Sequence, residues 1–475
     1  MIRRKIISLC RSNYSRLCSS MTQPDIDLGY YCDVSNSSEV KRNITSRKGV
    51  GNVDPHDALK QELYRELSKL PNKTHPSVQG YKDDPILVHE LNKKRDFGKH
   101  TPLEVSEITR LMNLMRTDKL GQTCGHKSYY FLGELAELEE ALIKYAVTYL
   151  VKENFKLVSV PDILPKNVLE SCGMTINSDR TQIYSLDPIH HGPDLYLSGT
   201  AEMSLAGFLM NSVHSSTDLP LKLAAVSRCF RAETSSVIDE RGVYRVHQFT
   251  KVEMFAVTTP QQSEEMLEYI RTLQEQMFVP LGFNMKVLDM PPHELGAPAY
   301  RKYDIEAWMP GRGNYGEVSS CSNCTDYQSR RLNIRYKQDD KTHYVHTLNG
   351  TACAIPRMLI TLLETHQDPK GKIFIPDALQ PFMNGKKYIT KNSAIPDLNP
   401  LILFLFLLSG MPLLSLLLFI LEEVLPSSQL LVNFALCLRR WERSVRFLLN
   451  FLFRLFPWHI FAFKCWQESV PAFIF

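Results

Sequence analysis

The sequence predicts an α+β fold in which a mainly antiparallel sheet is flanked by helices. Segments typical of strands come in runs, with helical segments between the runs and no regular alternation of strand and helix. Hydrophobic residues make up 44% and charged residues 22% of the 475, which excludes a wholly disordered chain and a polytopic membrane protein. No internal repeat is visible, and the length suggests about three structural units.

The first 24 residues differ from the rest of the chain in charge. They contain five basic residues and several serines but no acidic residue, with isolated apolar residues between them. This composition is typical of an amphipathic transit peptide and predicts import into the mitochondrial matrix; a disordered basic start without function is the alternative. Residues 25–395 then carry a net charge of −2, so any nucleic-acid contact must come from a local basic face.

The next elements are a short helix and a linker. Residues 25–51 are polar and lack apolar periodicity, residues 58–69 predict one short helix, and prolines and glycines interrupt residues 71–98 as in a linker. Residues 133–154 carry apolar side chains at helical spacing and predict an amphipathic helix, which leads into a strand at 157–161 that a proline ends.

The later part of the chain contains groups of predicted strands with helices between the groups. Strands are predicted at 221–229, 244–255, 283–288, 303–308 and 344–348, and helices at 261–278 and 355–367.

The apolar tail has two interpretations. Residues 401–421 lack charge and are long enough to cross a bilayer, although Gly410 and Pro412 interrupt them. A second apolar stretch follows at 424–438. The tail is either a membrane anchor, which would make the protein a membrane-tethered scaffold, or a non-native extension without caps or turns that join it to the preceding fold.

The eleven cysteines, odd in number and irregularly spaced, exclude a small disulfide-rich secreted domain and favour a reducing compartment. Cys321 and Cys324 form the only CxxC pair, and no second pair lies at zinc-ligand spacing. A metal-binding or redox function of Cys321 and Cys324 is therefore a weak hypothesis, and buried thiols without such a function are the alternative.

The most informative segment is a predicted hairpin made from residues 229–233 and 241–253. Alternation along a strand puts Arg231 with Glu233 on one face of the first strand, and Arg245, His247, Phe249, Lys251 and Glu253 on one face of the second. Such a face suits a nucleotide, with arginine for phosphate, glutamate for an exocyclic amine and phenylalanine for the base. A solvated hairpin with alternating charge is the alternative.

Three shorter motifs are weak by themselves. Pro356 and Arg357 fall in the first turn of the predicted helix at 355–367, where the positive helix end and an arginine can bind phosphate. Glu317 and Ser320 could share a divalent cation, and the hydroxyl of Thr200 with the carboxylate of Glu202 could hold a small amine.

In this order the motifs resemble the class II aminoacyl-tRNA synthetases, and specifically the seryl-tRNA synthetases of the mitochondrial type. Residues 133–161 resemble motif 1, residues 230–253 motif 2 and residues 349–357 motif 3. Residues 70–72, 125–130 and 303–312 also follow the seryl pattern, so the resemblance covers roughly residues 70–382. It implies a class II synthetase antiparallel sheet flanked by helices, and a homodimer built through motif 1.

The resemblance also implies a role for each motif residue. Arg231 and Arg357 would be catalytic, binding phosphate from two sides. The implied ATP site comprises Arg231, Ala232, Glu233, Arg245, Val246, Phe249, Glu317, Val318, Ser319, Ser320 and Arg357. The implied L-serine site comprises Thr200, Ala201, Glu202, Arg231, Glu253, Asn349 and Thr351. Glu317 and Ser320 would hold Mg²⁺, and tRNA(Ser) would accept the seryl group at its 3′ end.

The departure from the family lies near the start of the chain. The family has a long two-helix arm that grips tRNA, whereas about twelve residues of helix span only about 18 Å. The arm is therefore reduced, or an exon was skipped in the gene model. The predicted domains are residues 1–24 (transit peptide), 25–98 (reduced tRNA-binding arm and linker), 99–395 (catalytic domain) and 396–475 (atypical tail). An active ligase is favoured over a synthetase-like binding or regulatory protein, because the motif residues are intact.

Overall fold

The computed structural model describes Tyr30 and residues 33–46, 67–117, 124–176, 182–233 and 242–395. The chain divides into two compact units, Met1–Ile395 and Pro396–Phe475, and all of the described residues belong to the first. The predicted transit peptide, most of the predicted helix at 58–69 and the apolar tail lie outside the described residues. Within those residues, no helix combines the length and the apolar character that a membrane span requires.

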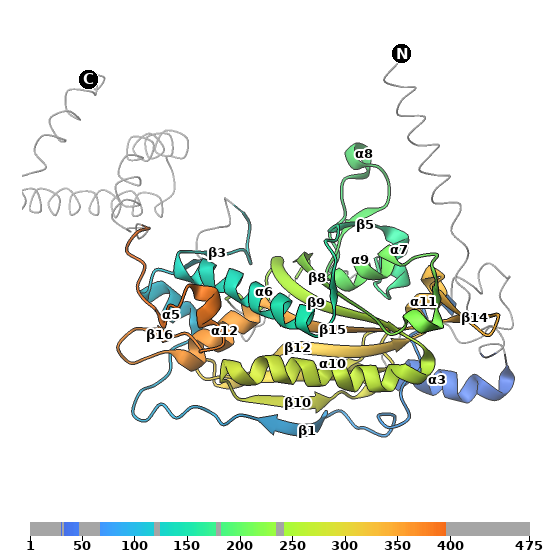
Figure 1. Ribbon diagram of the computed structural model, residues 1–475, viewed down its shortest axis with the longest axis horizontal. Helices are drawn as coiled ribbons and strands as arrows, with labels where there is room; N and C mark the ends of the chain where they lie inside the picture. Colours follow the sequence, from blue (N-terminus) through green and yellow to red (C-terminus); the bar gives the residue numbers. More distant parts are fainter. Residues whose placement is uncertain are drawn as a thin grey trace, which may run out of the picture. The chain divides into compact units, whose positions relative to one another are not determined.

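An eight-stranded sheet forms the centre, with the strand order β1-β10-β11-β12-β15-β9-β8-β4 (Figure 1). Every neighbouring pair is antiparallel except β4 and β8, so the predicted antiparallel architecture is confirmed. The strands are β1 (Ile86–Leu91), β4 (Lys156–Leu157), β8 (Leu221–Phe230), β9 (Gln248–Thr258), β10 (Met285–Asp289), β11 (Arg301–Met309), β12 (Asn314–Thr325) and β15 (His346–Ala354).

Helices cover both faces of the sheet, and this explains why strand β9 is buried along most of its length. Val252 and Met254 belong to one hydrophobic core, whereas Phe255 and Val257 belong to a second, because side chains alternate between the faces of a strand. The first core includes α6 (Glu134–Lys152), α10 (Ser263–Phe278) and α12 (Ile355–His366), and the second includes α7 (Lys166–Ser171), α9 (Ala201–Phe208) and α11 (Tyr327–Leu332).

The longest predicted helices are confirmed nearly to the residue. In α6 the apolar stripe of the sequence is the buried face, where Leu135, Leu138 and Leu142 are at most 2% exposed. The hydroxyl of Tyr145 donates to the carbonyl oxygen of Met277 at 2.7 Å and so joins α6 to α10. Helix α12 has proline in its first turn, as predicted, because proline costs no hydrogen bond there.

Short elements surround this framework. The sheet β14-β13-β7 and the pairs β16-β17, β2-β3 and β5-β6 lie outside the central sheet. These strands are β2 (Met115–Arg116), β3 (Tyr130–Phe131), β5 (Ile163–Pro165), β6 (Leu195–Leu197), β7 (Val213–Ser215), β13 (Arg335–Gln338), β14 (Lys341–Tyr344), β16 (Ile373–Phe374) and β17 (Tyr388–Ile389). The remaining helices include α3 (Ser37–Ser46), α5 (Val105–Leu111) and α8 (Pro188–His191).

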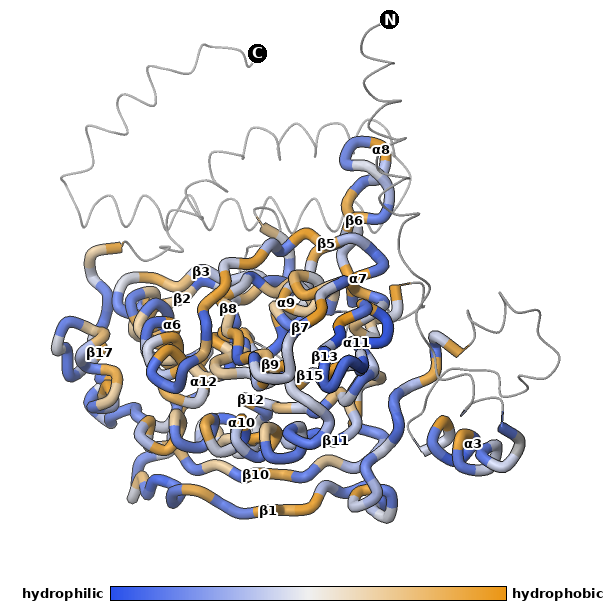
Figure 2. The backbone as a smooth tube through the Cα atoms, turned by 45° about the vertical axis from the view of Figure 1, so that its right-hand side comes forward, coloured by the Kyte–Doolittle hydropathy of each residue, from blue (hydrophilic) through white to orange (hydrophobic). Residues whose placement is uncertain are grey.

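The interpretation of residues 71–98 as a linker is wrong in part, because β1 lies within them. This strand pairs with β10 and forms the edge of the sheet in both views (Figures 1 and 2). The side-chain amide of Asn72 donates to the carbonyl oxygens of Pro298 and Cys324, both at 2.8 Å, so the start of the segment is also bound to the body. A six-residue strand between Pro85 and Asn92 gives too short a pattern to read from the sequence.

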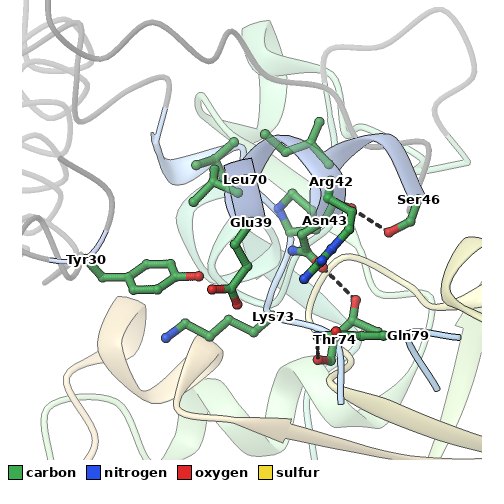
Figure 3. Close-up of a pocket in the computed structure, with 12 residues that line it drawn as sticks. Tyr30, Glu39, Arg42, Asn43, Ser46, Leu70, Lys73, Thr74 and Gln79 are labelled. Carbon is green, nitrogen blue, oxygen red and sulfur yellow. Dashed lines mark hydrogen bonds between the residues drawn. The ribbon is translucent and has the colours of Figure 1, made fainter. Parts of the chain in front are cut away.

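Helix α3 packs against the same segment beside a small cavity (Figure 3). The amide nitrogen of Asn43 donates to the carbonyl oxygen of Asn72 at 2.9 Å, and the hydroxyl of Thr74 donates to the amide oxygen of Asn43 at 2.6 Å. The ammonium of Lys73 lies 3.6 Å from the centre of the Tyr30 ring. Through Asn72, α3 is therefore connected to the end of β12.

Besides β1, four strands of the central sheet differ clearly from the sequence prediction, and one of them is β15, which spans His346–Ala354 instead of 344–348. Strand β12 was not predicted, because its glycine, serine and asparagine residues have low strand propensity and pairing on both sides holds it. Strand β4 covers only the first residue of the strand predicted at 157–161. Strand β9 begins at Gln248 instead of residue 244, because the chain turns after Gly242, which has a φ of +73°.

Candidate active site

One cavity gathers residues from six parts of the chain: the segment after β8, the turn before β9, strands β9, β12 and β15, and the start of α12. Every residue predicted for the ATP site lines it except Ala232, whose N–H donates to the carbonyl oxygen of Gln182 at 2.8 Å. Val246 and Val318 bury their side chains in the core, so they present backbone to the cavity. The antiparallel pairing of β8 with β9 thus brings both halves of the predicted hairpin to one place.

The alternation of side chains along the hairpin correctly placed most of its predicted residues at the cavity, but not His247. The guanidinium of Arg231 lies 5.3 Å from the centre of the Phe249 ring, and Arg245 forms an ion pair of 3.6 Å with Glu233. His247 does not line the cavity. Its ring nitrogen Nδ1 lies 2.9 Å from the carbonyl oxygen of Arg231, and it therefore fixes the backbone that carries the arginine.

Arg357 organises the side of the cavity opposite the hairpin. Its Nη1 donates to the backbone and carboxylate oxygens of Glu317, both at 3.0 Å, and its guanidinium lies 4.5 Å from the centre of the Tyr244 ring. Burial by itself would raise the pKa of Glu317, but the charges of Arg357 and Lys302 hold the pKa below its usual value. Glu317 is therefore ionised at neutral pH.

Glu317 and Ser320 fit a magnesium ion. Both line the cavity, and ionised carboxylate and hydroxyl oxygens are ligands that magnesium accepts, with phosphates and water as the others. Among the described residues, no group of three or more histidine, cysteine, aspartate and glutamate side chains could hold a metal ion by itself. Cys321 and Cys324 are both fully buried; Cys321 packs in the first core, and the Cys324 sulfur accepts a hydrogen bond from Asn349.

A second set of predicted residues converges beside the cavity, around two carboxylates. Glu202 Oε1 accepts from the amide nitrogen of Asn349 at 2.9 Å, and Glu253 forms an ion pair of 2.5 Å with Lys251. Thr351 lines the cavity, and its hydroxyl lies 3.5 Å from Glu253 Oε2. Burial, followed by the charge of Glu253, raises the pKa of Glu202 to about 7. A ligand that carries an ammonium group would stabilise both carboxylates.

Thr200 and Ala201 form the start of α9. The hydroxyl of Thr200 caps the helix by accepting from the N–H of Glu202, and the side chain of Ala201 is fully buried in the second core. Neither lines the cavity, so in this structure their contribution is to place Glu202. Strand β9 carries Glu253 and strand β15 carries Asn349 and Thr351, and these two strands are neighbours in the sheet.

Sequence reasoning missed three residues of this region. Tyr244 lines the cavity and stacks between Arg357 and Arg312, Gln182 donates to Glu233 at 3.3 Å, and Gln328 donates to Glu202 at 2.6 Å. Lys251 was placed on the face of the hairpin by its alternation with Phe249 and Glu253, and the structure adds its role, which is to neutralise Glu253. Gln182 and Gln328 could not have been found from the sequence, because their partners are 51 and 126 residues away in the chain.

Comparison with known proteins agrees with this geometry. Residues 184–366 match the tRNA synthetase class II core domain (G, H, P, S and T). The mitochondrial serine-tRNA ligase of Mus musculus is 44% identical over 342 residues, which cover 71% of this chain and 65% of the mouse protein. That of Bos taurus is 44% identical over 355 residues, covering 74% of this chain and 68% of the bovine protein.

A solved structure is similar over most of its length. The crystal structure of seryl-tRNA synthetase from Pyrococcus horikoshii complexed with ATP aligns with a TM-score of 0.65 at 31% identity, covering 82% of this chain and 93% of that protein. The match thus spans about two thirds of the two mammalian relatives and nearly all of the archaeal one. With its class II sheet and a cavity that motifs 2 and 3 share with strand β12, this chain belongs to the serine-tRNA ligases, a family of ATP-dependent class II aminoacyl-tRNA synthetases.

Proposed function

We propose that this chain activates L-serine with ATP to form seryl-adenylate and transfers the seryl group to the 3′ end of tRNA(Ser). The observation that supports this most is the single cavity in which Arg231, Phe249, Glu317 and Arg357 meet, next to the paired carboxylates. A cavity with arginines on two sides suits a polyphosphate, and the adjoining carboxylates suit the ammonium of an amino acid.

The chemistry of activation follows from the charges. The serine carboxylate is ionised at neutral pH, so its attack on the α-phosphorus needs no general base. It needs alignment and neutralisation of two anions that approach each other, which Arg231 and Arg357 provide from opposite sides. Phe249 stacks on the adenine and Glu233 accepts from its amino group. Magnesium held by Glu317 and Ser320 would neutralise phosphate charge.

Selection of serine rests on its hydroxyl group. Glu202, Glu253, Asn349 and Thr351 surround the amino acid with polar groups, and alanine would leave some of them unpaired in a buried site. A site that hydrogen-bonds a substrate hydroxyl rejects the analogue without it by a factor of about 10⁴ or more. Threonine is excluded by size.

The remaining parts of the proposal concern assembly and location. The mouse and bovine relatives are mitochondrial ligases, and the basic, acid-free start of the chain agrees with import into the matrix. We propose a homodimer through α6 and β4. Val151, Leu157 and Ile163, at and after the end of α6, are between 48% and 53% exposed, which is typical of an interface between copies.

Pyrophosphate exchange with the full-length chain tests the function. Serine should stimulate exchange of labelled pyrophosphate into ATP, whereas alanine, threonine and glycine should not, and tRNA charging is measured in parallel. Exchange driven by threonine or alanine but not by serine would contradict the specificity. No exchange with any amino acid, despite measurable ATP binding, would favour a synthetase-like binding or regulatory protein.

A further inference from the structure

Gln328 of α11 is a fully buried amide that contacts Glu202 and does not line the cavity. The hydroxyl of Thr347 donates to Gln328 Oε1 at 2.8 Å, and Gln328 Nε2 donates to Glu202 Oε1 at 2.6 Å. Both Gln328 and Thr347 are inaccessible to solvent. An ionised carboxylate can only accept hydrogen bonds, so the nitrogen of the amide must face Glu202 and its oxygen must face Thr347.

The two oxygens of Glu202 therefore have different surroundings. Oε1 accepts from the amides of both Gln328 and Asn349, at 2.6 and 2.9 Å. Oε2 has no hydrogen-bond partner among the described residues. Two donors on one oxygen hold the carboxylate in a single orientation and leave the other oxygen for a ligand.

We infer that Gln328 is a positioning residue for serine recognition: it orients the Glu202 carboxylate, so that Oε2 can accept from the substrate. This inference rests on the proposed function of the pocket. Gln328 is not itself in contact with the cavity, and Thr347 acts one step further away by fixing the direction of the amide.

The charges around Glu202 explain why it needs these donors. Burial and the charge of Glu253 raise its pKa, whereas the hydrogen bonds from Gln328 and Asn349 and the charge of Lys251 lower it. The other titratable group that faces it is the thiol of Cys172, directly after α7, whose own pKa is raised by burial and by Glu202. Without the Gln328 donor, the pKa of Glu202 rises further, because one of the hydrogen bonds that lower it is lost.

The test uses the full-length enzyme and serine-dependent pyrophosphate exchange over a range of pH. Gln328→Met keeps the length of the side chain but removes both polar atoms. It should raise the serine KM roughly 10- to 100-fold at neutral pH, because a hydrogen bond to a charged group is lost. The ATP KM should stay close to that of the wild type. The pH at which serine use is half-maximal should move upward, because Glu202 then ionises at higher pH.

If Gln328→Met does not fold, a second variant, Thr347→Val, tests the inference, with Thr258→Val as its control. Thr347→Val removes the hydroxyl that orients Gln328 and should raise the serine KM roughly 2- to 10-fold. Thr258→Val is the control, because the Thr258 hydroxyl is fully buried without a partner and lies on the neighbouring strand β9, opposite His346. It should leave the serine KM unchanged.

Two results would overturn the inference. One is a serine KM that Thr347→Val and Gln328→Met leave at the value of the Thr258→Val control. The other is a loss of kcat or a rise in both KM values with no shift of the pH profile, which would make Gln328 a structural residue of the core. If the wild type itself shows no serine-dependent exchange, the proposed function fails, and the inference fails with it.

Discussion

Arg357 has four contacts beside the cavity: with the backbone oxygen and the carboxylate of Glu317, and with the backbone oxygen and the ring face of Tyr244. Its guanidinium is therefore fixed before a substrate arrives. Preorganised charge is worth more than mobile charge, because no reorganisation is needed when negative charge develops on the phosphates.

Replacing Arg357 by alanine should lower serine-dependent exchange by a factor of roughly 10² to 10³. The fold should remain, because the side chain points into a cavity rather than into the apolar core. Arg330→Ala is the control: this arginine pairs with Asp326 on α11, near the surface, and its loss should leave exchange unchanged. A purified Arg357→Ala variant with wild-type exchange and normal thermal unfolding would show that the assigned role is wrong.

Glu253 is paired with Lys251 and is only 2% exposed, and its Oε2 lies 3.5 Å from the hydroxyl of Thr351, which lines the cavity. Glu253→Gln removes the charge with little change of shape. It should raise the serine KM by roughly 10- to 100-fold through loss of the charged partner of the ammonium, with a much smaller effect on the ATP KM. Steady-state exchange at varied serine and ATP measures both. An unchanged serine KM would exclude Glu253 from the pocket.

At the scale of elements, one carboxylate joins three parts of the fold. Glu364 of α12 accepts from the N–H groups of Gly311 and Arg312 in the β11–β12 turn, at 2.9 and 3.1 Å, and from that of Val105 at the start of α5, at 3.0 Å. It is inaccessible to solvent, and burial raises its pKa to about 7 despite these three donors.

This carboxylate predicts a pH-dependent effect on stability. Because the folded pKa lies above the unfolded value of 4.5, the folded state binds more protons between these two values. The contribution of Glu364 to stability is therefore complete below the unfolded value and is lost as the pH rises through about 7. Glu364→Gln removes this dependence and leaves the N–H of Val105 facing an amide donor.

We expect Glu364→Gln to lower the free energy of unfolding by about 1–3 kcal/mol at low pH, through one unsatisfied buried N–H. The difference in free energy of unfolding between the variant and the wild type should be smaller at about pH 8 than at about pH 5.5, because the wild type loses the stabilisation from protonated Glu364 over this range. Denaturant unfolding at both pH values measures this. The exposed Glu265→Gln on α10 should change stability by less than about 0.5 kcal/mol. A difference in unfolding free energy that grows as the pH rises would contradict the raised pKa of Glu364.

At the scale of the whole molecule, a charge placed at one edge of the sheet should weaken the homodimer, whereas a charge at the other edge should not. Leu157 on β4 and Leu87 on β1 are similarly exposed, at 53% and 51%, but lie on the first and last strands of the sheet. If the homodimer forms through α6 and β4, Leu157→Asp should shift the full-length protein toward the monomer, because a charge is costly in an apolar interface.

Light scattering at micromolar concentration measures the mass of each variant. Leu87→Asp is the control and should leave the dimer intact. A monomeric wild type would show that no such homodimer forms. Dissociation caused by Leu87→Asp and not by Leu157→Asp would show that the interface lies elsewhere than at α6 and β4. Stable dimers usually bury more than about 1,200 Å² in total, so a single charge at the edge of the interface weakens association without unfolding the subunit.

The sequence by itself determined the long, periodic elements and the chemistry of the nucleotide cavity. The stripe of α6, the proline at the start of α12 and the pairing of β8 with β9 follow from patterns of two to four residues. The motif residues identified the cavity because their types suit phosphate and adenine, although Ala232 faces elsewhere and His247 supports the backbone of Arg231.

Only the tertiary structure decided which elements meet. Strand β1 joins the sheet through β10, about 200 residues away, and β12 is a strand because both of its neighbours pair with it. Gln328 reaches Glu202 because α11 and α9 pack on the same side of the sheet. Local periodicity reports which face of an element is apolar but not which element covers that face. Strand order and polar contacts between distant residues are therefore set by packing of the whole chain.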